Sequence, residues 1–277
     1  MDDFRFSVSM CVYGKDDPEH FRIALYSVYR QTLLPDEVVL VVDGPVPEET
    51  EAVIKSFGTY PGFKVFRLLQ NMGHGIARMT GLKHCSLPYV AIADADDINL
   101  PDRFKKQINA FKKDPELSVL GGALKQFIGA PDNVIATSIK PTEDAEIKRF
   151  LRTHSPIAQT TAMFRKADVM AVGGYLDWYC AEDYYLWLRL YLAGCKFGNL
   201  QNCLVYVRVS EAQYRRRGGW RFFNSTRKLF GFMLKNKIIG LPLYIYNVAV
   251  RFVLQILLPT KLRGWIRKKY YGNKKID

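Results

Sequence analysis

Runs of aliphatic and β-branched residues alternate with amphipathic segments over the first two-thirds of the chain. The apolar runs have the length of buried strands, and the segments between them repeat apolar residues with the period of a helix. This alternation predicts an α/β fold with a largely parallel sheet flanked by helices. The predicted strands are Ser7–Tyr13, Glu37–Asp43, Lys64–Leu69, Tyr89–Asp94 and Leu117–Phe127.

The segments between these strands carry helix start and stop signals. Asp17 followed by Pro18 is a strong start, because Asp caps unpaired amides and Pro fits the first helical turn. Gly194 is a typical stop. The predicted helices are Pro18 to about Gln31, Glu48–Phe57, His74–Cys85, Pro101 to about Lys113, and Asp183–Ala193.

A second long apolar segment, Ile238–Leu258, is interrupted by Pro242. Asn247, Arg251 and Gln255 recur at every fourth position and form a polar stripe on an otherwise apolar helix. A helix that spans a membrane needs about 20 apolar residues with no charge at its centre, so this pattern favours an interfacial helix with a basic face. The alternative is an amphipathic helix packed on the protein's own core.

Charge is distributed unevenly along the chain, whose net charge is +13 at pH 7. The segment from Arg208 to Asp277 holds 17 of the 40 basic residues but only 2 of the 27 acidic residues. Such a basic region indicates a polyanionic partner, either nucleic acid or acidic lipid. Its richness in Leu, Ile, Val and aromatic residues favours an anionic membrane surface over nucleic acid.

Cysteine usage and the first residues of the chain bear on the compartment. The five cysteines are scattered and include no C-x-x-C pair, which speaks against a zinc knuckle or a disulfide framework. The first ten residues lack the basic and then apolar layout of a secretory signal. We therefore expect a cytoplasmic protein that is held peripherally on the inner face of the cell membrane.

Three carboxylates, Asp94, Asp96 and Asp97, follow directly after a buried strand. Like charges this close raise one another's pKa unless a cation lies among them. Mg²⁺ and Mn²⁺ prefer oxygen ligands and commonly share one or two carboxylates with substrate phosphates. The cluster predicts a Mn²⁺ or Mg²⁺ site, and the alternative is a turn that caps the next helix.

A glycine-bearing turn joins the third predicted strand to the helix that begins at His74. Gly73 and Gly75 allow close approach of a ligand to the backbone, and a helix N-terminus favours an anion. Arg78, one turn into the helix, can reach a phosphate. Neither G-x-G-x-x-G nor a P-loop is present, which speaks against dinucleotide-binding and NTPase sites. A plain strand-to-helix turn remains the alternative.

Glu182 and Asp183 open a helix whose other residues are mostly apolar and aromatic. Acids at a helix N-terminus are favoured by the macrodipole alone. The preceding Gly173-Gly174-Tyr175 and the aromatic surroundings nevertheless predict a partly dry pocket, in which a carboxylate becomes a useful general base.

Taken in order along the chain, these segments resemble the family-2 glycosyltransferases with the GT-A fold, in particular bacterial capsule, exopolysaccharide and O-antigen enzymes. The resemblance covers roughly residues 6–210 and implies a Rossmann-like, mixed and mostly parallel sheet, with a basic amphipathic helical extension after it. The matching segments are Val8–Tyr13, Ser27–Thr32, Glu37–Gly44, Asn71–Gly81, Asp94–Asp97, Gly173–Tyr175 and Ala181–Asp183.

The resemblance implies a donor site for a nucleotide-diphosphate sugar, with UDP favoured as the nucleotide. Asp43 matches the residue that binds the base, near Cys11 and Tyr13 on the first strand. Arg78 matches the arginine that helps to hold the nucleotide.

The resemblance also implies the metal ligands and the catalytic base. Asp94 and Asp96 match the DxD pair, with Asp96 as the direct ligand and Asp97 beside it. Asp183 matches the catalytic base of an inverting transfer, and Glu182 matches the neighbour that shapes the acceptor site.

The region after residue 210 adds one candidate to the donor site. Arg216, in the run Arg215–Arg217 followed by Gly218-Gly219-Trp220, is expected to close over the leaving diphosphate. The alternative is a solvated or lipid-facing cluster. We expect residues 1–210 to form the catalytic domain, with a nucleotide half at 1–100 and an acceptor half at 101–210, and residues 211–277 to form the membrane-associating region.

The predicted function is transfer of a sugar to a hydroxyl of a lipid-linked saccharide in surface polysaccharide biosynthesis. A processive synthase is a poorer match, because Arg217 stands where its QxxRW motif needs Trp. A nucleotidyltransferase that makes nucleotide sugars and a non-catalytic nucleotide-binding regulator remain the alternatives. The sequence leaves the oligomeric state open.

Overall fold

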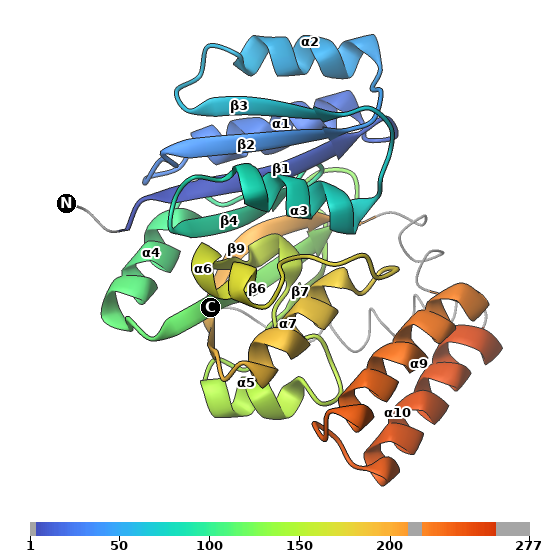
Figure 1. The fold of residues 1–277 in the computed structure, drawn as a ribbon. Coiled ribbons are helices and arrows are strands. Elements are labelled where there is room, and N and C mark those ends of the chain that lie inside the picture. Colours follow the sequence, from blue (N-terminus) through green and yellow to red (C-terminus); the bar gives the residue numbers. More distant parts are fainter. Residues whose placement is uncertain (1–3, 210–217, 259–277) are drawn as a thin grey trace.

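The computed structural model describes residues 4–209 and 218–258 (Figure 1). Its centre is one mixed sheet of nine strands. The strands are β1 (Phe6–Tyr13), β2 (Glu37–Asp43), β3 (Phe63–Leu68), β4 (Tyr89–Asp94), β5 (Ile98–Asn99), β6 (Leu117–Phe127), β7 (Val134–Ser138), β8 (Met163–Arg165) and β9 (Lys196–Arg208).

The strand order is β3-β2-β1-β4-β8-β6-β9-β5, with β7 paired on β6. β1 to β4 run parallel to one another, so their carboxyl ends meet at one edge of the sheet. β8 runs antiparallel to β4 and to β6, whereas β6 and β9 are parallel. The predicted mixed, mostly parallel sheet is therefore confirmed.

The sheet is covered by helices on both faces because consecutive residues of a strand point to opposite sides. On β2, Val38, Leu40 and Val42 enter one hydrophobic core, and Val39 enters the other. The first core is closed by α1 (Pro18–Tyr29), α2 (Glu48–Phe57) and α4 (Arg103–Lys113). The second is closed by α3 (His74–His84), α5 (Asp144–Phe150), α6 (Lys166–Ala171) and α7 (Glu182–Leu192).

The predicted elements of the first half agree with the structure to within about two residues at each end. Asp17 caps α1 as predicted, accepting a hydrogen bond from the amide of His20. Pro101 does not open α4 as predicted, because it lies in a turn and α4 begins at Arg103. The sequence pattern did not predict β5 or, in the second half of the chain, β7, β8, β9, α5, α6, α9 (Gly219–Lys235) and the 3₁₀ turn η1 (Gln159–Thr161).

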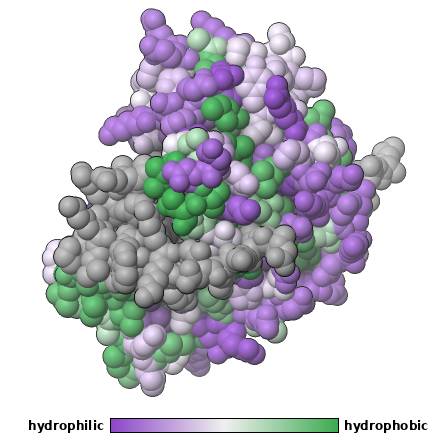
Figure 2. Space-filling model, turned by 180° about the vertical axis from the view of Figure 1, so that it is seen from behind, coloured by the Kyte–Doolittle hydropathy of each residue, from purple (hydrophilic) through white to green (hydrophobic). Residues whose placement is uncertain are grey.

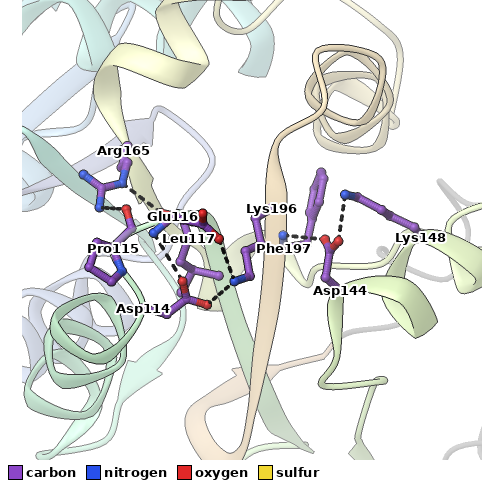
Figure 3. Close-up of polar contacts among 9 residues, drawn as sticks. All are labelled: Asp114, Pro115, Glu116, Leu117, Asp144, Lys148, Arg165, Lys196 and Phe197. Carbon is purple, nitrogen blue, oxygen red and sulfur yellow. Dashed lines mark hydrogen bonds and ion pairs between the residues drawn. The ribbon is translucent and has the colours of Figure 1, made fainter.

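A group of ion pairs fixes the beginning of β9 between α4 and α5 (Figure 3). Lys196 Nζ lies 2.8 Å from a carboxylate oxygen of Asp114 and 3.3 Å from one of Glu116. Asp144 accepts a hydrogen bond from the amide of Phe197 and pairs with Lys148. Exposed pairs of this kind contribute about 1 kcal/mol or less each. They lie at the edge where the parallel strands begin, opposite the carboxyl ends of β1 to β4.

The C-terminal helices α9 (Gly219–Lys235) and α10 (Leu241–Phe252) lie side by side, and η2 (Val253–Leu257) extends α10 with a π-helical turn (Figure 1). α9 inserts Leu229, Phe230 and Met233 into the core that α7 also closes. The predicted division at residue 210 therefore separates elements that share one hydrophobic core.

The polar stripe of α10 faces the protein, which corrects the predicted basic face. Asn247 is fully buried, and it donates a 3.1 Å hydrogen bond to the carbonyl oxygen of Arg152. Arg251 donates to the next carbonyl along that segment, and Gln255 accepts a 3.1 Å hydrogen bond from Thr226. The stripe faces inward because each of its polar side chains finds a partner on the protein. Within residues 4–209 and 218–258, no helix has the length and apolar character needed to cross a membrane.

Candidate active site

The predicted donor-site residues of three strands meet at the carboxyl edge of the sheet. In the parallel register, Tyr13 lies opposite Asp43, and Cys11 lies opposite Asp94. Burial raises the pKa of the Cys11 thiol to about 12, so this side chain is neutral at physiological pH. The edge therefore brings together two carboxylates, a neutral thiol and a phenol.

Asp43 holds the glycine-bearing turn in place. Its two carboxylate oxygens accept hydrogen bonds from the amides of Met72, at 2.7 Å, and Gly73, at 3.0 Å. Asn71 adds a 3.3 Å bond from its amide group to the backbone carbonyl of Asp43. A carboxylate offers about four acceptor positions, so these bonds leave capacity for a ligand donor. The base-binding role of Asp43 stays a prediction.

Two glycines make this arrangement possible. Gly44 has φ of +84°, and a Cβ there would lie 2.5 Å from the backbone nitrogen of Asn71. Gly73 precedes α3 with φ of +87°. Among the described residues no side chain caps the N-terminus of α3, so the positive end of its dipole faces this edge.

Arg78 joins the two predicted halves of the site. Its guanidinium donates to Asp94, at 3.0 Å, and to Glu182, at 2.7 Å. Only 9% of its side chain is exposed. Burial opposes its charge, but the two carboxylates raise the pKa of Arg78 above its ordinary value. Arg78 therefore serves as a buried cross-link between the end of β4 and the start of α7, and its predicted contact with a nucleotide stays a prediction.

Asp97 is held by the protein on both of its carboxylate oxygens. The hydroxyl of Thr160 donates to one, at 2.5 Å, and the amide of Arg208 donates to the other, at 3.0 Å. Burial, then the charges of Asp96 and Asp94, raise the pKa of Asp97 well above its ordinary value. Because both oxygens of this buried carboxyl already accept hydrogen bonds from the protein, the geometry does not favour the predicted metal role of Asp97.

Asp94 and Asp96 fit a divalent cation better. Both are half-buried at the carboxyl edge, where 32% of the Asp94 side chain is exposed. No group of three His, Cys, Asp or Glu side chains in the described part of the chain forms a ready metal cage. Mg²⁺ and Mn²⁺ sites that also use substrate phosphates need only one or two carboxylates. Two oxygen-bearing side chains at the open edge therefore match a metal that arrives with a diphosphate.

Asp183 has the electrostatics of a general base. Burial and the neighbouring charge of Glu182 raise its pKa to about 6, against the opposing charge of Arg78. One of its oxygens accepts a 2.7 Å hydrogen bond from the amide of Tyr184. Glu182 is instead paired with Arg78, and only 12% of its side chain is exposed. The structure thus gives the adjacent acids different surroundings.

Hydrogen bonds from α9 hold the segment that precedes α7. Ser225 accepts a hydrogen bond from the indole of Trp178 on its carbonyl, at 3.3 Å, and donates from its hydroxyl to the carbonyl of Tyr179, at 2.6 Å. Cys180, two residues before Glu182, has φ of +54°, an unfavourable value for a residue with a Cβ. Strain of this kind is commonly stored next to functional groups.

Two residues that support the site were not predicted from the sequence, namely Thr160 and Arg208, which hold Asp97. No local signal marks them, because each acts on a partner more than 60 positions away in the sequence. Tyr175, which the sequence placed beside the predicted pocket, is buried and accepts a hydrogen bond from Gln159 near Arg78. Arg216 lies outside the described residues, as do Arg215 and Arg217.

Comparison with known proteins identifies the family. The profile described as Glycosyl transferase family 2 matches residues 7–172, which include Asp43, Arg78 and the Asp94–Asp97 turn. The chain belongs to glycosyltransferase family 2. It is therefore a glycosyltransferase, and the nucleotidyltransferase and regulator alternatives lose their support.

Relatives within glycosyltransferase family 2 cover nearly the whole chain. The chain is 36% identical over 265 residues, 96% of each chain, to the UDP-Gal:α-D-GlcNAc-diphosphoundecaprenol β-1,3-galactosyltransferase of Escherichia coli. It is 34% identical to the amylovoran biosynthesis glycosyltransferase AmsE of Erwinia amylovora, covering 95% of this chain and 98% of that one.

A solved structure supports the GT-A fold. TarS of S. aureus, residues 1–349 in complex with UDP-GlcNAc, superposes with a TM-score of 0.67 at 19% identity, covering 95% of this chain and 79% of that one. At this identity the likeness concerns the fold.

Proposed function

We propose that this glycosyltransferase moves a sugar from a nucleoside diphosphate, with UDP favoured, to a hydroxyl of a lipid-linked saccharide, with inversion at the anomeric carbon. The observation that carries the proposal is the double ion pair of Arg78 with Asp94 and Glu182. It holds the acidic turn that suits a metal-bound diphosphate close to the helix that bears a candidate base. A donor and an acceptor bound on either side of Arg78 would meet between these elements.

Asp183 is the proposed general base. As the acceptor oxygen forms its bond to the anomeric carbon, the bond from that carbon to the diphosphate oxygen breaks, and Asp183 takes the hydroxyl proton. A base positioned in this way typically accelerates a reaction about 10²–10⁴-fold. Glu182 is less suited to this step because its carboxylate is already committed to Arg78. Its proposed role is to position Arg78 and to shape the acceptor side.

Asp94 and Asp96 are the proposed ligands of Mn²⁺ or Mg²⁺. A divalent cation bound there with the donor supplies Lewis-acid stabilisation of the leaving diphosphate. Asp97, held by Thr160 and Arg208, fixes the turn on which these two acids lie. The N-terminus of α3 provides a second anion-stabilising element at the same edge.

The donor and acceptor classes rest on the relatives. The galactosyltransferase relative uses UDP-Gal and a sugar linked through diphosphate to undecaprenol, and the AmsE relative belongs to amylovoran biosynthesis. We infer a related lipid-linked acceptor here, used in surface polysaccharide synthesis. An acceptor anchored in this way places the reaction at the inner face of the cell membrane.

Calorimetric titration of UDP, GDP and dTDP, with and without Mn²⁺, tests the donor half of the proposal. We expect UDP to bind with Mn²⁺ and to lose at least tenfold in affinity when the metal is omitted. Asp96→Asn should show the same loss with metal present, because it removes a charged ligand. Asp97→Asn is the matched control and should bind within about threefold of the wild type, since an amide can keep both protein contacts.

Transfer from UDP-Gal to a synthetic GlcNAc-diphosphate lipid tests the reaction itself, with the anomeric configuration of the product read by NMR. Asp183→Asn should bind UDP normally and lose about 10²-fold or more in kcat. Retention at the anomeric carbon, or full activity of Asp183→Asn, would contradict the mechanism. Failure of every nucleotide to bind would remove the donor site.

A further inference from the structure

The outward side of α10 and η2 is an apolar face. Its large hydrophobic side chains are 37% to 61% exposed, whereas Asn247 on the same helix is fully buried. Trp220 of α9, 61% exposed, contacts the rings of Phe223 and Phe252 at one end. The face consists of Leu241, Ile245, Tyr246, Val253, Leu254 and Leu257, together with Trp220.

The same face appears in Figure 2, where hydrophobic residues gather at the lower left over α9 and α10. A helix that only covers a protein core shows the opposite arrangement, with apolar residues inward and polar residues toward water. α10 turns Asn247 and Arg251 toward the protein, and both bond to backbone there. Seven exposed, large hydrophobic side chains gathered on one pair of surface helices mark an interaction site.

The cations around the apolar face indicate what covers it. From residue 218 to residue 258 the sequence holds six basic residues and no acidic residue. All of them except Arg251 are exposed, namely Arg221, Arg227, Lys228, Lys235 and Lys237. Arg221 also lies 4.0 Å from the ring centroid of Tyr179, so the other four cations are the ones left for lipid phosphates. Exposed apolar side chains and exposed cations on the same pair of helices are typical of helices that lie in the interface of an anionic membrane.

A pocket adjoins the apolar face at the α9–α10 turn. It has a volume of about 520 Å³ and is lined by Arg152 and Lys237 beside the apolar side chains of Leu234, Ile238 and Leu243. Two cations next to aliphatic side chains suit a lipid phosphate and the first carbons of its chains.

We propose that the apolar face docks on an anionic lipid bilayer, with its side chains in the boundary between headgroups and acyl chains and with the cations of α9 and of the pocket on lipid phosphates. The sequence predicted an interfacial helix with a basic face; in the structure the polar stripe bonds to the protein, so the exposed cations come from α9 and the α9–α10 turn instead. The inference adds a defined contact surface to the proposed site of action, and it does not depend on the identity of donor or acceptor.

A bilayer is favoured over a second copy of the chain because of the charge of the surroundings. Two copies meeting through this face would bring ten exposed cations together, five from each, without an acidic residue in either hairpin. The residues that follow, 259–277, add seven basic residues and one acidic residue. The sequence around the face therefore repels a second copy and attracts an anionic membrane.

Flotation of the full chain with lipid vesicles tests this proposal without substrate, so its failure is separate from any failure of the reaction. The wild type should bind vesicles that contain phosphatidylglycerol and bind pure phosphatidylcholine vesicles at least tenfold more weakly. The double variant Ile245→Ser and Leu257→Ser should lose at least tenfold in partitioning to the anionic vesicles. Both positions are more than half exposed, so the fold should persist, as a circular dichroism melt would check.

Leu34→Ser is the matched control, because Leu34 is 57% exposed, as Ile245 is, but lies outside α9 and α10. It should bind vesicles like the wild type. Equal vesicle binding by the double variant, or no binding by the wild type at low salt, would overturn the proposal. So would a dimer in light scattering that the double variant converts to a monomer, because the face would then be covered by a second copy.

Discussion

At the scale of single residues, the site separates acids of the same type by their surroundings. Asp97 is enclosed and held by two donors, whereas Asp183 is half-buried at the start of a helix with Glu182 beside it. Asp94 is tied to Arg78 and still reaches the surface. Position relative to water and to Arg78, rather than residue type, distinguishes these carboxylates and underlies the different roles proposed for them.

The raised pKa of Asp183 predicts a pH profile. A base is active only when deprotonated, so kcat/KM should rise with pH and level off above about 6, the pKa to which burial and Glu182 raise this carboxyl. Glu182→Gln should move the inflection to lower pH, because it removes a repelling charge and leaves Arg78 to act on Asp183. Initial rates between pH 4.5 and 8 with the donor at saturation would measure both curves, and an unmoved inflection would contradict the assignment.

The same pKa shift affects stability. The folded protein holds a proton on Asp183 more tightly than the unfolded chain does. The free energy of unfolding therefore falls as the pH rises from 3.8, the ordinary pKa of this carboxyl, to about 6, its pKa in the fold. The ionised Asp183 therefore destabilises the folded protein at neutral pH.

At the scale of elements, local signals were sufficient where an element is defined by its own residues. β2 and α2 have the predicted bounds, because a continuous aliphatic run and a helix start bounded by Pro47 and Gly58 are local features. β8 and η1 could not be predicted, since each is three residues long and is held by distant partners. β9 was missed because polar residues interrupt its apolar pattern where its pairing with β6 is irregular.

The candidate site divides in the same way. The acids Asp43, Asp94, Asp96 and Asp183 stand at ends of strands or helices, a feature that is visible in the sequence. Their partners are not visible there, because the ion pair from Arg78 to Glu182 joins positions 104 residues apart. The sequence could not predict that the polar stripe of α10 faces the protein. A periodic pattern shows which residues share one side of a helix, but it does not show what that side contacts.

The turn after β2 approaches the glycine-bearing turn closely at Gly44, which predicts a large difference in stability between two glycine substitutions. Gly44→Ala should lower the free energy of unfolding by roughly 3 kcal/mol, because it combines a positive φ with a Cβ 2.5 Å from a backbone atom. Gly129→Ala has a similar φ of +72° but open space around it, so about 1 kcal/mol is expected. Urea denaturation of both variants measures the difference, and equal losses would mean that the contact with Asn71 is relaxed in solution.

At the scale of the whole molecule, the hairpin formed by α9 and α10 both completes the hydrophobic core and presents the apolar face to the outside. α9 fills the core beneath α7 and holds the Trp178–Tyr179 segment, while α10 presents the apolar face on its other side. The catalytic part and the hairpin are therefore expected to unfold together.

Truncation tests that expectation. A chain of residues 1–210 lacks Leu229, Phe230 and Met233, each exposed by 1% or less, and should aggregate or show no cooperative melt. Burial of side chains of this size is worth about 1.5–3 kcal/mol each, a large part of the stability of a typical domain. A chain of residues 1–258 should melt cooperatively within a few degrees of the full chain. Cooperative unfolding and UDP binding by residues 1–210 would instead support two independent domains.

The way in which α10 is attached has a consequence for the evolution of the family. Asn247 and Arg251 bond to the backbone carbonyls of Arg152 and Thr153, and backbone carbonyls are supplied by any amino acid. These two bonds therefore place no demand on the side chains at positions 152 and 153, whereas they require the side-chain length and donor chemistry of Asn247 and Arg251. The attachment persists without paired substitutions, so a search for correlated changes between sequences would pass over the contact that orients this helix.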